Sequence, residues 1–355
     1  MSEILDHLKE MISISGLSGF EKPIRDLIQK TWEPLADEIS VSKLGSLHAL
    51  RRGRGPQPRS SIMVATHMDA IGLIVTKING EFLHITELGG IDPRVLPGQQ
   101  VTVHGAQDLP GVVVQPSAHT LPDEFQSSPV PLKHLLIDVG FTANQVSKQI
   151  KIGDLVSFAT EPIELKGDLL AGHSLDNRAS VAALTKTLKL LQTRHHDWDV
   201  WAVATAQEEE TLGGALTSGF DLQPSLGVVI DVTFAKGPGA SDYRTSDMDK
   251  GPTLAWGPNT HPKLYDRFEK LAKKLEIPVQ REVYHRHSGT DAITLQIAGR
   301  GIPTMVVCIP LRYMHTPVEM VHLKDVARTG RLLAEFITAL DEDTMEQLKW
   351  DKEES

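Results

Sequence analysis

The sequence contains a single cysteine, Cys308, in 355 residues. One cysteine excludes an intrachain disulfide and is typical of a reducing compartment. No apolar run approaches the roughly 20 residues that cross a bilayer. Residues 1–16 alternate charged and apolar side chains, without the apolar core of a signal peptide. These absences predict a cytoplasmic protein with no membrane partner.

Basic residues are also scarce: 36 Lys and Arg stand against 46 Asp and Glu, which gives a formal net charge of −10. This balance argues against a nucleic acid as partner. No glycine-rich phosphate-binding pattern lies between a predicted strand and a helix, so nucleotide binding is unsupported. Covalent catalysis is unsupported as well, because Cys308 lies inside an apolar run and Ser288 lacks a Gly-x-Ser-x-Gly turn.

The length exceeds one average domain, and the order of apolar and amphipathic runs predicts an α/β protein with an insertion. Short β-branched runs separated by Gly and Pro predict a small β-barrel over residues 70–165. We assign residues 1–69 and 166–345 to one discontinuous α/β domain, and residues 346–355 to a charged C-terminal tail. Further expectations are one strand around 38–50, a solvated hairpin tip at 51–59 and a mobile loop at 117–133.

The most informative stretch is residues 201–210, an apolar run that ends in three consecutive acids. The run suits a buried strand, and adjacent carboxylates repel each other unless a positive charge lies against them. For this stretch alone, a solvated acidic turn before a helix is an equally good explanation. Other predicted strands and loops, however, also end in residues that bind metals: His67, Asp176, Asp231 and His315.

Loops at the carboxyl ends of the strands of an open α/β sheet converge, so we expect these side chains to meet Glu208 and Glu209 at one edge. Two imidazoles with several carboxylates match Zn²⁺ or Co²⁺ better than Mg²⁺ or Ca²⁺. Five ligands, one of them bridging, suit two ions about 3.5–4 Å apart. Taken singly, His67 is equally explained as a structural partner of Asp69, and Asp176 as a helix cap.

Seven segments in this order resemble metallopeptidase family 42, the glutamyl aminopeptidase and tetrahedral aminopeptidase group, some members of which are labelled cellulase M or endoglucanase. They are THMDAIG (66–72), GGIDPR (89–94), LDNR (175–178), AQEE (206–209), IDVT (230–233), GTDA (289–292) and IPLRYMHTPVE (309–319). The chain departs from the family's usual residues at Asn177, Glu210, Thr211 and Ser288. None of these departures removes a ligand, so they concern loop shape and substrate preference.

The resemblance implies a three-layer α/β/α catalytic domain of the zinc-peptidase type, with an inserted β-barrel of the PDZ-like or dimerisation type. It implies a cytosolic aminopeptidase that removes N-terminal residues from short peptides and holds two ions, Zn²⁺ or Co²⁺, in each subunit. It also implies a homo-oligomer, a tetrahedral dodecamer built from dimers.

The same resemblance implies five metal ligands: His67, Asp176, Glu209, Asp231 and His315. Asp176 would bridge the two ions. His67 and Asp231 would complete one site, and Glu209 and His315 would complete the other.

Glu208 would act as the general base, and Asp69 would accept a proton from the imidazole of His67 and so fix its tautomer. Two other functions stay open: a metal-dependent hydrolase of another bond, such as a deacetylase or glucanase, and a catalytically silent peptide-binding scaffold. The basic cluster His285, Arg286 and His287 is compatible with selection of an acidic N-terminal residue. It is equally compatible with a solvated loop or a subunit contact.

Overall fold

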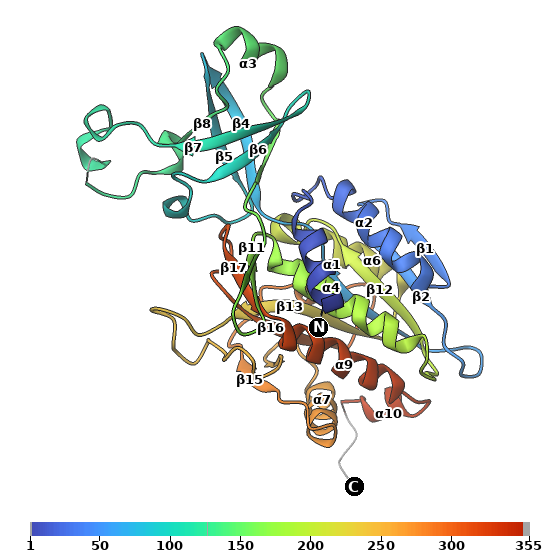
Figure 1. Ribbon diagram of the computed structural model, residues 1–355. Helices are drawn as coiled ribbons and strands as arrows, with labels where there is room; N and C mark the ends of the chain where they lie inside the picture. Colours follow the sequence, from blue (N-terminus) through green and yellow to red (C-terminus); the bar gives the residue numbers. More distant parts are fainter. Residues whose placement is uncertain (1, 126, 351–355) are drawn as a thin grey trace.

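The computed structural model describes residues 2–125 and 127–350, which form an α/β part and a β-barrel joined to it (Figure 1). Throughout the described residues, every helix is too short or too polar to span a membrane. The α/β part contains an 11-stranded sheet. Nine strands follow the order β1-β2-β12-β3-β13-β16-β17-β11-β10; β14 also pairs with β16, and β15 pairs with β14. The predicted α/β architecture with an inserted β-barrel is therefore confirmed.

Four parallel strands form the centre of this sheet: β12, β3, β13 and β16. They are almost wholly buried because helices cover both faces, which explains why they read as continuous apolar runs rather than as alternating ones. The strands of the sheet are β1 (Glu38–Val41), β2 (Leu47–Arg51), β3 (Ser61–His67), β10 (Ile163–Leu165), β11 (Leu169–Gly172), β12 (Asp199–Thr205), β13 (Leu226–Phe234), β14 (Thr253–Trp256), β15 (Gln280–Val283), β16 (Thr304–Arg312) and β17 (Glu319–His322).

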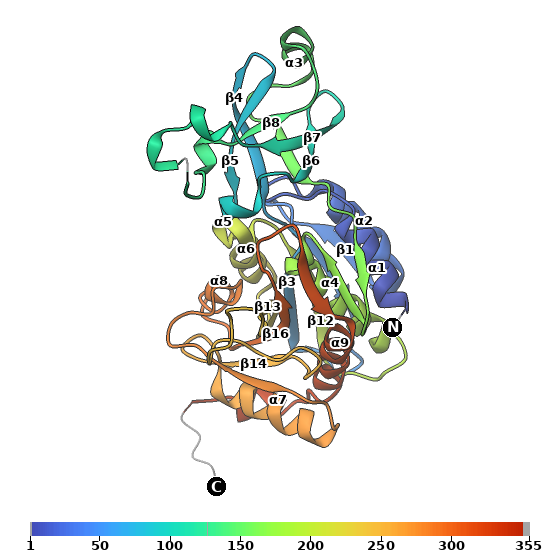
Figure 2. The ribbon, with the colours of Figure 1, turned by 60° about the vertical axis from the view of Figure 1, so that its left-hand side comes forward.

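The helices form one layer on each face of the sheet, as the alternation of side chains along β3 demonstrates. Ile62 and Val64 pack into the core beneath α4 and α9, whereas Met63 and Ala65 pack with α8 on the opposite face. Figure 2 shows α6 and α8 across the sheet from α1 and α9. The helices of this part are α1 (Ser2–Ile12), α2 (Lys22–Trp32), α4 (Leu175–Leu191), α5 (Glu208–Thr211), α6 (Gly213–Leu222), α7 (Pro262–Lys274), α8 (Ala292–Leu295), α9 (Leu323–Thr338) and α10 (Thr344–Gln347).

The insert is a closed antiparallel barrel in the order β4-β5-β8-β7-β6-β9, with its own hydrophobic core. Its strands extend from Gly72 to Phe158, whereas β10 pairs with β11 in the large sheet. The domain boundaries at 69/70 and 165/166 stay a prediction. The elements of the barrel are β4 (Gly72–Asn79), β5 (Phe82–Leu88), β6 (Gln100–His104), β7 (Asp108–Val114), β8 (Leu136–Asp138), α3 (Ala143–Gln149) and β9 (Leu155–Phe158).

Some local expectations were wrong. Residues 38–50 form two antiparallel strands instead of one, because the chain turns at Gly45, whose φ is +99°. Residues 51–59 are not a hairpin tip, since β2 and β3 both pair with β12 rather than with each other. The mobility expected of residues 117–133 stays a prediction; the described residues 117–125 and 127–133 contain two 3-10 turns and the start of a third. Of the predicted tail, residues 351–355 lie outside the described part.

Candidate metal centre

The carboxyl ends of neighbouring parallel strands carry the first candidate ligands to one edge of the sheet. β3 ends at His67, which pairs with Thr205 at the end of β12. On the other side of β3, Ala65 pairs with Val229, so that Asp231 lies level with His67. The predicted convergence at strand ends follows from this register.

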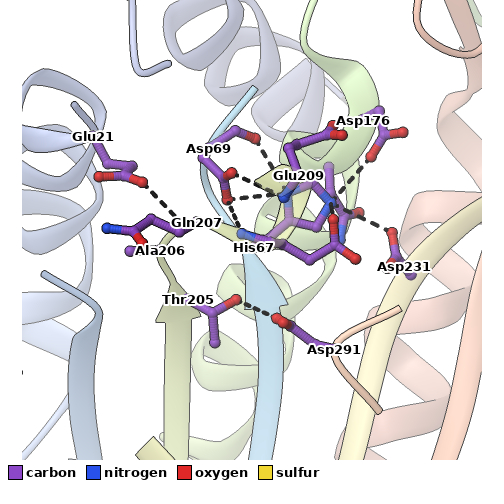
Figure 3. A network of polar contacts seen from close by, with 12 residues as sticks. Glu21, His67, Asp69, Asp176, Thr205, Ala206, Gln207, Glu209, Asp231 and Asp291 are labelled. Carbon is purple, nitrogen blue, oxygen red and sulfur yellow. Dashed lines mark hydrogen bonds and ion pairs between the residues drawn. The ribbon is translucent and has the colours of Figure 1, made fainter. Parts of the chain in front are cut away.

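Turns with left-handed backbone carry the other candidates toward the same edge. Ser174, Gln207 and His315 have φ values of 59°, 60° and 60°, which are uncommon for residues other than glycine. The turn at Gln207 is held by its backbone N–H, which donates to Glu21 Oε1 over 3.0 Å (Figure 3). Asp176 follows Ser174 at the start of α4, where its own backbone is not yet helical.

The two imidazoles face opposite oxygens of one carboxylate. His67 Nε2 lies 3.1 Å from Asp176 Oδ1, and His315 Nε2 lies 3.5 Å from Asp176 Oδ2. Asp231 Oδ1 and Glu208 Oε2 lie 3.6 Å and 3.8 Å from His67 Nε2. Glu209 Oε2 lies 3.4 Å from His315 Nε2. Asp176 is therefore shared between two halves of one cluster.

Each imidazole is oriented by a backbone carbonyl. His67 Nδ1 donates to the carbonyl of Asp69 over 3.1 Å, and His315 Nδ1 donates to the carbonyl of Gly90 over 2.8 Å. A carbonyl only accepts, so in the neutral rings the lone pair belongs to Nε2, the atom that faces the carboxylates. Histidines that bind metals are commonly oriented in this way.

The donor set fits divalent ions. Two groups of three residues have ligand atoms within 4.8 Å of one another: His67, Asp176 and Glu209, and His67, Glu208 and Asp231. Nitrogen and carboxylate donors together suit Zn²⁺ or Co²⁺. His315 belongs to neither group, although its Nε2 lies close to Asp176 and Glu209.

The charges of the cluster are unbalanced without a cation. Burial raises the pKa of Glu208 well above its ordinary value and raises that of Glu209 to about 8, with neighbouring acids adding to both shifts. Burial also raises the pKa of Asp231. For His67, burial is outweighed by the charge of Glu208 and by hydrogen bonds to other acids, so its pKa is raised. A bound cation would relieve this crowding of acids.

Asp69 contacts the cluster through both its carboxylate and its backbone carbonyl. Its carboxylate accepts hydrogen bonds from the backbone N–H groups of Glu208 and Glu209, over 3.0 Å and 3.2 Å. The carboxylate Oδ1 lies 3.5 Å from His67 Nδ1, which is farther than the residue's own backbone carbonyl. Asp69 thus holds both His67 and the turn that carries the two glutamates (Figure 3).

Glu319 is a residue of the site to which sequence reasoning gave no role. Its side chain is 1% exposed, and its two oxygens accept hydrogen bonds from the backbone N–H groups of Asp176 (3.0 Å) and His315 (2.9 Å). It therefore holds two candidate ligands that are far apart in the sequence. In the sequence, the available signals were its place at the end of the segment 309–319 and its spacing of four residues from His315.

The cluster opens into a cleft of about 580 Å³ whose other wall includes residues 282–290. His285, Arg286 and His287 line this wall and are exposed to solvent. The same wall contains Glu282, which is buried and accepts hydrogen bonds from Thr253 and Tyr284. Side chains of both charge signs therefore line the space next to the candidate ligands.

A family model described as M42 glutamyl aminopeptidase matches residues 45–332. The chain belongs to this family. It is 34% identical over 339 residues to the lysyl aminopeptidase of Pyrococcus furiosus, an alignment that covers 94% of this chain and 96% of that relative. The resemblance inferred from the sequence segments is confirmed, and this M42 metallopeptidase is an aminopeptidase.

Solved structures of TET aminopeptidases share the fold of this M42 peptidase. The TET aminopeptidase of a marine sediment Thaumarchaeota archaeon is similar with a TM-score of 0.92 and 29% identity, covering 98% of this chain and 99% of that one. The TET1 peptidase of Pyrococcus horikoshii, with a TM-score of 0.83 and 29% identity over 95% of this chain and all of that one, is described as assembling into a tetrahedron or an octahedral shell. A further structure, with a TM-score of 0.82, 28% identity and coverage of 96% and 100%, is described as a dodecamer.

Proposed function

We propose that this M42 peptidase is a dinuclear aminopeptidase that removes N-terminal residues from short peptides. The observation that carries the proposal is the position of Asp176, whose two oxygens face the Nε2 atoms of His67 and His315. In the proposed centre Asp176 would help to hold both of two ions, Zn²⁺ or Co²⁺. His67 and Asp231 would complete one site, and Glu209 and His315 would complete the other.

When bound, the two ions supply Lewis acidity to the scissile carbonyl and lower the pKa of a water. Glu208 is the proposed general base, which takes the proton from the attacking water and transfers it to the leaving amine. Burial favours this role because it raises the proton affinity of the carboxylate. Asp69 fixes the position of Glu208 through the backbone N–H of that residue.

Chelation tests the metal requirement. We expect a chelator to abolish hydrolysis of Leu-anilide and short peptides, and Zn²⁺ or Co²⁺ to restore it, with two ions per subunit by metal analysis. Hydrolysis of acetylated amines or glucans, but not of peptides, would identify a hydrolase of another bond. A chain that binds no ion and cleaves none of these substrates would indicate a silent peptide-binding scaffold.

We further propose that the chain forms a homo-oligomer, a tetrahedral dodecamer built from dimers. The support is its similarity over nearly the full length to the TET1 peptidase that assembles into a tetrahedron. Light scattering measures the mass directly. A monomer at working concentration would contradict the proposal without affecting the assignment of the metal centre.

A further inference from the structure

The turn at Gly89 and Gly90 belongs to the β-barrel but contacts the metal centre. β5 ends at Leu88, and Figure 2 shows this end of the strand beside α5. The Gly89 N–H donates to Glu210 Oε1 over 2.6 Å. The Gly90 carbonyl accepts from His315 Nδ1 over 2.8 Å. Two successive barrel residues therefore contact the two segments that supply Glu209 and His315.

The two histidines differ in what orients them. The side chain of His67 is 2% exposed, and the carbonyl that accepts from it belongs to Asp69, two residues away on the same loop. The side chain of His315 is 34% exposed, and the carbonyl that accepts from it lies 225 residues away in the barrel. Glu319 holds the backbone of His315 but not its ring. The direction of the ring thus depends on the position of the barrel turn.

We propose that the Gly89–Gly90 turn is a positioning element of the metal centre, through which the barrel directs Nε2 of His315 toward Asp176 and Glu209. This inference rests on the metal site proposed above. It predicts that the two ion sites respond differently to a change in the barrel, because only the site that contains His315 depends on the position of the barrel relative to the α/β part. The half that contains His67 and Asp231 is held by the α/β part alone.

Gly90→Ala tests the proposal at the ring. The added Cβ would lie 3.3 Å from His315 Nδ1, close enough to displace the ring by a few tenths of an ångström, and the Gly90 backbone is not left-handed. We expect one ion equivalent to bind about 10- to 100-fold more weakly, the usual effect of disturbing a partner that orients a ligand. The second equivalent should bind as in the wild type. Competition with a chromogenic chelator measures both affinities.

Gly80→Ala is the matched control on the same barrel hairpin. Gly80 has a φ of +62°, and a Cβ added there would meet no atom within 4 Å beyond its chain neighbours. Alanine at this position therefore strains the backbone without reaching His315. We expect this variant to melt at a lower temperature and to keep both ion affinities. This outcome would separate loss of positioning from loss of folding stability.

Glu210 provides a second test through the other contact of the turn. We expect Glu210→Ala to weaken the binding of the same ion equivalent as Gly90→Ala. Glu210→Gln should bind this ion with the wild-type affinity, because an amide oxygen still accepts from the Gly89 N–H. If the wild type binds no ions, the proposed function itself fails. If the wild type binds two ions while Gly90→Ala and Glu210→Ala bind both with unchanged affinity, the positioning role alone is refuted.

Discussion

The exchange Glu208→Gln separates a general base from a metal ligand. It removes the charge and the proton-accepting oxygen but keeps the shape of the side chain. Of the three acids near His67 Nε2, Glu208 is the most distant at 3.8 Å, against 3.1 Å for Asp176 and 3.6 Å for Asp231. We therefore expect the variant to retain two ions per subunit.

The expected loss of activity follows from the role. A positioned general base contributes about 10²- to 10⁴-fold to a rate, which corresponds to about 2.7–5.4 kcal/mol of transition-state stabilisation. The loss should appear in kcat with little change in KM, because proton transfer occurs in the transition state rather than in the bound substrate.

Hydrolysis of Leu-anilide together with metal analysis of the same preparation measures both quantities. Glu81→Gln, the same exchange at an exposed position of the barrel, serves as the control and should leave both unchanged. Near-normal turnover of Glu208→Gln would refute the general-base role. Loss of an ion would instead make Glu208 a ligand, grouped with His67 and Asp231.

Four further results are expected. Asp176→Asn should lose both ions and all activity, since the bridging charge disappears; retention of two ions in metal analysis would contradict this. Burial lowers the pKa of His315, but its hydrogen bond to Asp176 and the charge of Glu209 raise it to about 9 in the metal-free protein. A ligating imidazole is neutral, so the apparent ion affinity should rise with pH up to about 9, and binding below that pH should release a proton. Calorimetry in buffers of different ionisation enthalpy measures this release. A binding enthalpy that is the same in all buffers, with an ion affinity that does not change with pH, would contradict the expectation. Arg286→Ala should change the kcat/KM ratio of Glu-anilide to Leu-anilide by no more than about fivefold, because an exposed charge contributes up to about 1 kcal/mol; a larger effect would indicate a desolvated pocket. Phe336→Ala should lower the unfolding free energy by about 3–5 kcal/mol, because its buried ring stacks on Phe268 at 4.0 Å, and urea denaturation checks the value.

The residues at strand ends were predictable from the apolar runs that precede them and from the topology of a parallel sheet. His67 and Asp231 end or interrupt apolar runs, and strands buried on both faces read as such runs. Parallel strands bring their carboxyl ends to one edge whatever their order. The prediction that these side chains meet therefore did not need the strand order, and the error at residues 51–59 left it intact.

Glu319 was not predictable in the same way. It begins β17, a strand of four residues that is too short to establish a period in the sequence. An acid in such a segment is normally solvated, yet this one is buried because two backbone N–H groups converge on it. Only the tertiary structure brings Asp176 and His315 close enough for one carboxylate to accept from both.

The hydrogen bond between the Gly90 carbonyl and His315 could not be predicted from the sequence, for a physical reason. The acceptor is a backbone carbonyl, which every residue has, so no residue type at position 90 signals the hydrogen bond. What distinguishes the position is the space available to it, since a side chain there would lie against the imidazole. We therefore expect the glycine at 90 to be required because it has no side chain that would contact the imidazole. Gly90→Ala tests this requirement and keeps the backbone carbonyl.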